Sequence, residues 1–160
     1  MKASSHMLLG TALYAGYVAM TGRPLSIVEM AVAAVASLLP DIDHPKSTFG
    51  RIVPIISVPL SAIVGHRGIT HSLLAVFGMA LLGATSFHSS SLAMALVIGY
   101  LSHLVGDFFT NSGIPLAWPL KRRYVIPLLK TGSFAEYLLM VVLCFVLFWL
   151  IAIDLPRLTW

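Results

Sequence analysis

The chain has 160 residues, of which 58% are hydrophobic and 10% are charged, and its formal net charge is +4. Its mean hydropathy of +0.93 and its small charged fraction, against roughly 25% in an ordinary globular domain, exclude a typical soluble protein and predict an integral membrane protein. The basic residues lie beside apolar segments and are not interleaved with aromatic residues, so the positive charge does not indicate nucleic-acid binding.

The first part of the chain predicts two short helices and a segment at the membrane surface. Residues 7–21 and 25–39 are apolar but short for spans, so they form either two oblique spans or one re-entrant hairpin. Residues 51–65 contain two prolines. These argue against an uninterrupted helix and favour an interfacial position.

The rest of the chain predicts three longer helices. Residues 71–87 and 92–109 form a helical hairpin, and residues 135–153 form the clearest transmembrane helix, close to the ~20 residues that a span requires. Between them, residues 114–130 combine three prolines with aromatic and basic side chains, which suits the headgroup region. The expected fold class is therefore all-α: an integral membrane helical bundle with about five transmembrane helices and short interfacial segments, in one domain over residues 1–160.

The basic residues favour one orientation of this bundle. With five spans and the N-terminus inside, eight of the ten basic residues fall on the cytoplasmic side, and only Arg23 and Arg157 fall outside. The candidate functional residues then all come to the cytoplasmic ends of the helices. The role of Glu136, at the start of the last span, stays open, because a carboxylate is favourable at any helix N-terminus.

Three short motifs, residues 40–45, 65–72 and 103–107, hold three of the six acidic residues and four of the six histidines. Ionisable groups at membrane depth are costly, so they are normally paired, solvated in a cavity or bound to an ion. His103 and Asp107 are four residues apart and share one helix face. Carboxylates and imidazoles together predict a metal centre, whose candidate ligands are His6, Asp41, Asp43, His44, His71, His103 and Asp107.

This number of ligands exceeds the four-coordinate shell of one structural zinc ion. One or two divalent ions are expected, and two ions bridged by a carboxylate would use the ligands best. Ligation without cysteine suits zinc, and also fits manganese or iron. His71 is expected at a helix start with Thr70 as its N-cap. The simpler alternatives are a solvated turn at residues 41–44 and a buried His103–Asp107 pair that only joins helices.

The same motifs resemble a known family. The chain resembles the YdjM-like family of membrane-bound metal-dependent hydrolases in four segments that follow in the same order, residues 38–47, 65–77, 99–107 and 113–119. The match runs from about His6 to Glu136. The resemblance implies an inner-membrane location and a metal-dependent hydrolase activity. The His-x-x-x-Asp pair is also similar to zinc-dependent phospholipase C and related nucleases, an analogy at motif level only.

The mechanism implied is metal-assisted hydrolysis. Asp43 would bridge two ions or accept the proton of the nucleophilic water, and His66 would orient the site or donate a proton. Arg67 would bind a phosphate through its planar guanidinium group. A site at the headgroup level of the inner leaflet favours an amphipathic substrate, such as a phospholipid or another lipid phosphoester, with a peptide or amide bond as the alternative.

Two alternatives belong to other functional classes. A metal-ion transporter or channel would use histidine and aspartate inside the membrane, but it should carry polar residues through the depth of its helices. A non-catalytic membrane protein would keep the metal for structure alone. Neither the oligomeric state nor the identity of the metal follows from the sequence.

Overall fold

The computed structural model describes residues 1–65, 67–120 and 122–160, so His66 and Lys121 lie outside the described residues. Within those ranges the chain is all-helical, and its helices follow one another as α1 (Ala3–Thr21), α2 (Ile27–Ala36), the 3-10 helix η1 (Leu39–Asp43), α3 (Thr48–Ile52), α4 (Pro54–Val64), the 3-10 helix η2 (Ile69–His71), α5 (Leu73–Ser86), α6 (Ser90–Phe108), α7 (Phe134–Asp154) and the 3-10 helix η3 (Leu155–Arg157).

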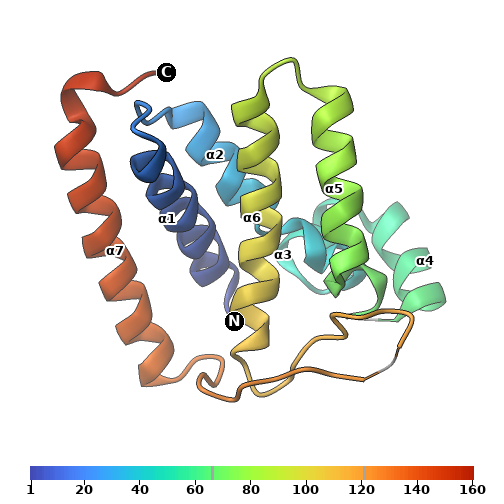
Figure 1. The fold of residues 1–160 in the computed structure, drawn as a ribbon. Coiled ribbons are helices and arrows are strands. Elements are labelled where there is room, and N and C mark those ends of the chain that lie inside the picture. Colours follow the sequence, from blue (N-terminus) through green and yellow to red (C-terminus); the bar gives the residue numbers. More distant parts are fainter. Residues whose placement is uncertain (66, 121) are drawn as a thin grey trace.

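Helix α6 is the centre of the bundle. It packs against α1, α2 and α5, and α1 in turn packs against α2 and α7, so α7 and α5 lie at opposite sides of the bundle (Figure 1). Small buried side chains where α1, α2 and α6 meet, among them Ala15, Ala33 and Ala95, allow this tight packing.

The crossing of α2 and α6 depends on Gly99. A Cβ atom at Gly99 would lie 2.3 Å from the carbonyl oxygen of Ala33 and 2.8 Å from Cβ of Ala36, so only glycine permits this approach. One helical turn further along both segments, His103 reaches the carbonyl oxygen of Ser37, 2.7 Å from its Nδ1 atom. The close crossing therefore sets the depth and direction of His103.

The expectation of about five transmembrane helices is wrong by the measure of length and apolarity. Among the described residues, only α6 and the helix from α7 to η3 are long and apolar enough to cross a membrane. Helix α1 has 19 residues, but the polar Ser4, Ser5 and His6 in its first turn lower its hydropathy. Helix α2 has 10 residues and α5 has 14, so they are about 15 Å and 21 Å long, against a hydrocarbon core of ~30 Å.

The positions of the predicted helices agree well with the structure, with one error in the proline-rich segments. Residues 51–65 were expected to lack an uninterrupted helix, yet Pro54–Val64 forms α4 with Pro59 inside it. Pro54 stands in the first turn, where a missing N–H costs nothing, and an 11-residue helix tolerates the one bond that Pro59 removes. Among the described residues of 114–130 there is no helix, and isolated bridges join Thr110 to Leu129 and Ile114 to Tyr124.

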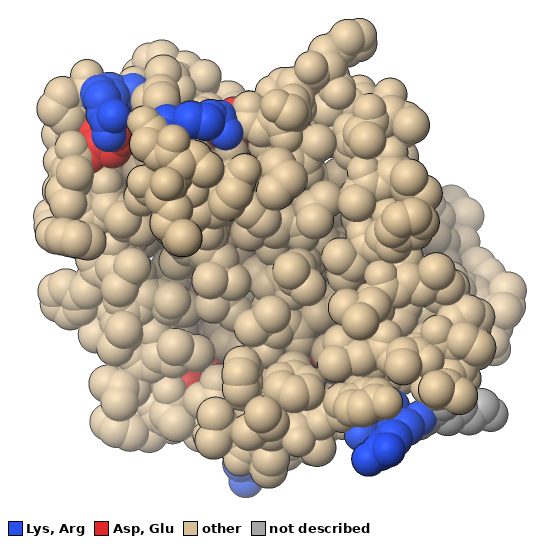
Figure 2. All heavy atoms as spheres, viewed as in Figure 1, with Lys and Arg blue, Asp and Glu red and all other residues tan. Residues whose placement is uncertain are grey.

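The surface agrees with a membrane protein. Figure 2 shows lysine and arginine side chains at two opposite ends of one face of the molecule, with a broad band between them that carries few charged atoms. Large apolar side chains of α7 are exposed, among them Phe145, Phe148 and Trp149. A protein in water would bury such a row.

Candidate metal centre

Four elements bring ionisable side chains to one end of the bundle, where α1 begins and α6 ends (Figure 1). Helix α6 supplies His103 and Asp107, one turn apart. The other residues come from α1, η1 and η2, and they are His6, Asp41, Asp43 and His71.

Two histidine nitrogens lie at the centre of this group. The Nε2 atoms of His71 and His103 are 3.3 Å apart. Oδ1 of Asp41 lies 3.7 Å from the first and 3.6 Å from the second, and Oδ2 of Asp107 lies 3.9 Å and 3.8 Å from them. Four donor atoms from four residues thus surround one small volume.

The second nitrogen of each ring faces an acceptor. Nδ1 of His103 lies 2.7 Å from the carbonyl oxygen of Ser37. Because a carbonyl oxygen only accepts, Nδ1 of His103 carries the proton and Nε2 presents its lone pair. Nδ1 of His71 lies 3.3 Å from Oδ2 of Asp43. Metal-binding histidines are usually held in this way, by a carbonyl or carboxylate oxygen on the second ring nitrogen.

Asp43 is buried on the Nδ1 side of His71. Its Oδ2 atom accepts hydrogen bonds from the backbone N–H of Arg67, at 2.9 Å, and from the hydroxyl of Thr70. These contacts make Asp43 a support of His71. That Asp43 bridges two ions stays a prediction, and these hydrogen bonds do not favour it.

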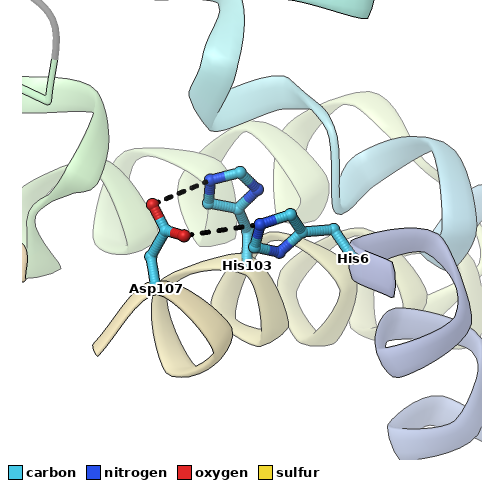
Figure 3. Close-up of side chains that lie close together, drawn as sticks. All are labelled: His6, His103 and Asp107. Atoms are coloured by element: carbon cyan, nitrogen blue, oxygen red, sulfur yellow. Dashed lines mark ion pairs between the residues drawn. The ribbon is translucent and has the colours of Figure 1, made fainter. Parts of the chain in front are cut away.

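The two oxygens of Asp107 have different neighbours. Oδ1 lies 3.4 Å from Nε2 of His6 and 3.1 Å from the α-amino group of Met1, whereas Oδ2 faces His103 (Figure 3). Oδ2 also lies 2.5 Å from Nη2 of Arg67. The guanidinium group that was expected to bind phosphate is therefore paired with Asp107.

His6 is fixed by stacking on His103. The ring centroids are 3.9 Å apart and the planes differ by 13°, as Figure 3 shows. A Cβ atom at Gly106 would lie 3.2 Å from Nδ1 of His6, so glycine leaves room for the ring. This buried Nδ1 atom has no hydrogen-bond partner among the described residues.

Burial and neighbouring charges shift the pKa values of Asp41 and His71 in opposite directions. Burial alone would raise the pKa of Asp41, but the hydrogen bond with His71 and the nearby histidines outweigh it and lower the pKa to about 2. Burial alone would lower the pKa of His71, but its contacts with Asp41 and Asp43 raise that pKa above the usual value. Asp41 is therefore an anion at neutral pH, and His71 holds a proton more tightly than an ordinary histidine.

His44 is the one described candidate ligand that does not join this group. His44 follows η1, where its backbone N–H donates to the carbonyl oxygen of Asp41. Among the described residues, two groups of three have donor atoms within 4.8 Å of one another, Asp41–His71–His103 and His6–His103–Asp107, and His44 belongs to neither. The prediction for His66 falls outside the described residues. The N-cap prediction is wrong, because α5 begins at Leu73 and Ser72 caps it by accepting from the backbone N–H of Ala75, at 3.3 Å.

Glu136, whose role the sequence left open, ties α7 to α1. Its carboxylate accepts from the backbone N–H of Lys2 at 2.7 Å and from that of Gly132 at 2.6 Å. It therefore satisfies N–H groups at the start of α1 and in the loop before α7. Through this anchor it holds the end of α1 that carries His6.

Three supporting groups were not predicted: the carbonyl of Ser37, the hydroxyl of Thr70 and the hydroxyl of Tyr100, which donates to the backbone oxygen of Thr70 at 2.6 Å. Thr70 directly precedes His71, and this adjacency was the only signal in the sequence. A backbone carbonyl carries no signal of residue type. The role of Ser37 therefore had no trace in the sequence.

The donor set fits a divalent ion. The five pairwise distances that link the two Nε2 atoms to each other and to the oxygens of Asp41 and Asp107 run from 3.3 to 3.9 Å. Metal–ligand bonds of 2.0–2.2 Å in a tetrahedron place the ligand atoms about 3.4 Å apart. The donor atoms of Asp41, His71 and His103, which lie within 4.8 Å of one another, thus come close to the spacing of three ligands of one ion.

Comparisons with known proteins agree with the sequence motifs. The family model described as "YdjM inner membrane protein" matches residues 1–158. The chain is 43% identical over 102 residues to the inner membrane protein YdjM of Escherichia coli (strain K12) and to that of Shigella flexneri, which covers 61% of this chain and 52% of each relative. It is 41% identical over 115 residues to the uncharacterized protein YvsG of Bacillus subtilis (strain 168), covering 71% of this chain and 72% of YvsG. No solved structure matches the chain.

Proposed function

The chain belongs to the YdjM inner membrane protein family, and within this family we propose that it is a metal-dependent hydrolase. Its substrate would be a phosphoester of a lipid or of another amphipathic molecule, and its site would open to the cytoplasmic leaflet. The match covers about half the length of the E. coli relative. The proposal therefore concerns the site that this chain carries.

The observation that carries the proposal is the pair of Nε2 atoms of His71 and His103, 3.3 Å apart. Both Nδ1 atoms face acceptors, so each neutral ring points a lone pair at the other. Two lone pairs at this distance repel unless a positive charge lies between them. A proton meets this need in the metal-free protein, and a divalent ion meets it better because two carboxylates lie beside the nitrogens.

Three residues would hold one ion: His71, His103 and Asp41, whose donor atoms lie within 4.8 Å of one another. Two histidines and one carboxylate, with a fourth position left open, are typical of catalytic zinc sites. His6 lies on the far oxygen of Asp107, so it would complete the surroundings of Asp107 or of a second ion. Zinc fits this donor set, and manganese and iron remain open.

Asp107 would stand beside the open fourth position and would not bind the ion itself. Oδ2 of Asp107 lies slightly further from the two nitrogens than Oδ1 of Asp41 does. Arg67 pairs with the same Oδ2 atom. A divalent ion supplies the Lewis acidity that makes water ionise near neutral pH and that polarises a phosphoryl oxygen. Asp107 would then accept the proton of the attacking water, while Arg67 keeps the carboxylate in place.

The exposure of the site residues indicates the side from which a substrate would arrive. Asp41 is 25% exposed, whereas the side chains of His71, His103 and Asp107 are at most 1% exposed. A substrate would therefore reach the centre past Asp41. Nε of Arg67 has no hydrogen-bond partner among the described residues, which leaves one N–H for a phosphate oxygen.

A non-catalytic metal protein is the second candidate, and one observation favours it. If Asp107 also bound the ion, four protein donors would hold it and leave no position for water, as in structural zinc sites. A metal-ion transporter has less support, because the apolar Ala15, Ala33 and Ala95 fill the bundle on the far side of the centre.

The test begins with the metal content of protein purified in detergent without chelators. We expect stoichiometric zinc, manganese or iron in the wild type, its loss in His71→Ala and His103→Ala, and its retention in His88→Ala. His88 is an exposed histidine in the turn between α5 and α6, which makes it a matched control. A wild type without metal would refute both candidates.

Hydrolysis of a panel of phospholipids and soluble phosphoesters then separates the two candidates. A metal-dependent activity that is absent from His71→Ala supports the hydrolase. Metal-loaded protein that cleaves nothing in the panel supports the structural role.

A further inference from the structure

The hydroxyl of Thr70 lies between the carboxylate of Asp43 and the ring of His71. Thr70 is buried, its hydroxyl donates to Oδ2 of Asp43, and the same hydroxyl oxygen lies 3.0 Å from Nδ1 of His71. The hydroxyl of Tyr100 donates to the backbone oxygen of Thr70 at 2.6 Å. Tyr100 therefore fixes this threonine from α6, three residues before His103.

The donors and acceptors of Asp43, Thr70 and His71 determine the tautomer of His71. The Thr70 hydroxyl has one proton, and that proton goes to the carboxylate of Asp43, which only accepts. Toward His71 the Thr70 oxygen must then accept, as must Oδ2 of Asp43 at 3.3 Å. Nδ1 of His71 therefore carries the hydrogen in the neutral ring, and the lone pair lies on Nε2, which faces His103 and Asp41.

We propose that Thr70 is a positioning residue that holds His71 in the Nδ1–H tautomer through the Tyr100–Thr70–Asp43 chain of hydrogen bonds. In the other tautomer, Nε2 would carry a hydrogen and point it into the space between His71, His103 and Asp41. One part of the inference, that the lone pair on Nε2 of His71 binds an ion, rests on the proposed metal centre. The tautomer itself does not.

The alternative is that Thr70 only fills space. Two substitutions separate these roles, because Thr70→Val keeps the shape and removes the hydroxyl, whereas Thr70→Ser keeps the hydroxyl and removes the methyl group. If the hydroxyl matters, valine is the worse replacement. If packing matters, serine is the worse one.

The first measurement is the affinity for zinc, by competition with a chelator. We expect Thr70→Val to bind about 10- to 100-fold more weakly, which is the usual cost of losing a residue that supports a ligand, and Thr70→Ser to remain close to the wild type. Thr85→Val is the matched control, since Thr85 is exposed on α5 and its hydroxyl donates to the backbone carbonyls of Leu81 and Leu82 in its own helix. It should bind like the wild type, and thermal unfolding of the metal-free proteins reports any loss of folding.

The second measurement does not depend on a metal. Nitrogen-15 NMR of histidine-labelled, metal-free protein at alkaline pH, where the ring is neutral, should show Nδ1–H for His71 in the wild type and in Thr70→Ser. The Thr70→Val variant keeps only the longer 3.3 Å contact between Nδ1 and Asp43, so we expect it to show a larger fraction of the Nε2–H tautomer than the wild type. A wild type that binds no zinc but shows Nδ1–H would refute the metal centre and keep the tautomer assignment.

Three results would overturn the inference. They are an Nε2–H ring in the wild type, an unchanged Thr70→Val variant, and a Thr70→Ser variant that is more damaged than Thr70→Val.

Discussion

The substitution Gly99→Ala tests whether the crossing of α2 and α6 builds the proposed metal centre. The new Cβ atom would lie 2.3 Å from the carbonyl oxygen of Ala33. The helices must separate by about 1 Å before this contact becomes an ordinary van der Waals distance. A shift of that size would lengthen the 2.7 Å contact between Nδ1 of His103 and the carbonyl of Ser37 to about 3.7 Å, which is no longer a hydrogen bond.

The expected cost follows from two opposing effects. Alanine is a better helix former than glycine by roughly 0.5–1 kcal/mol, which an unobstructed site would gain. Overpacking of a tight contact costs about 1–3 kcal/mol. We therefore expect a net loss of about 1–2 kcal/mol in the free energy of unfolding, together with weaker metal binding, because His103 loses the acceptor that holds its Nδ1–H group.

Gly78→Ala in α5 is the matched control, since a Cβ atom there meets nothing within 4 Å. Unfolding of both variants in detergent, followed by circular dichroism with and without added zinc, measures the two effects. A Gly99→Ala variant as stable as Gly78→Ala, with normal zinc affinity, would refute the role of this crossing.

Two further predictions concern the ligands. Zinc affinity should fall as the pH decreases, because a protonated imidazole has no lone pair for a metal. The pKa of His71 is raised, so its share of the loss should begin above the usual histidine pKa of about 6.5 and approach about tenfold per pH unit for the one displaced proton. Chelator competition at a series of pH values measures this slope, and a flat profile would contradict it. Asp107→Asn should retain bound metal and lose activity, whereas loss of the metal in this variant would make Asp107 a ligand and favour the structural role.

The local pattern of the sequence was enough to locate the helices. Hydrophobic runs and helix periodicity depend on neighbouring residues, so the predicted segments 92–109 and 135–153 agree with α6 and α7 to within two residues at each end. The error at Pro59 has the same origin, because a rule based on local sequence predicts that proline interrupts a helix, whereas α4 continues through Pro59.

The sequence alone also determined which residue types the candidate site holds, because the few carboxylates and histidines of this membrane protein gather in three motifs, with His103 and Asp107 on one helix face. Only the tertiary structure decided which of these atoms meet. That Asp43 supports His71, that Arg67 pairs with Asp107 and that Ser37 orients His103 depend on how α2, α6 and the 3-10 helices cross. These crossings are fixed by contacts between residues far apart in the chain, such as Gly99 against Ala33, and no local pattern encodes such a distance.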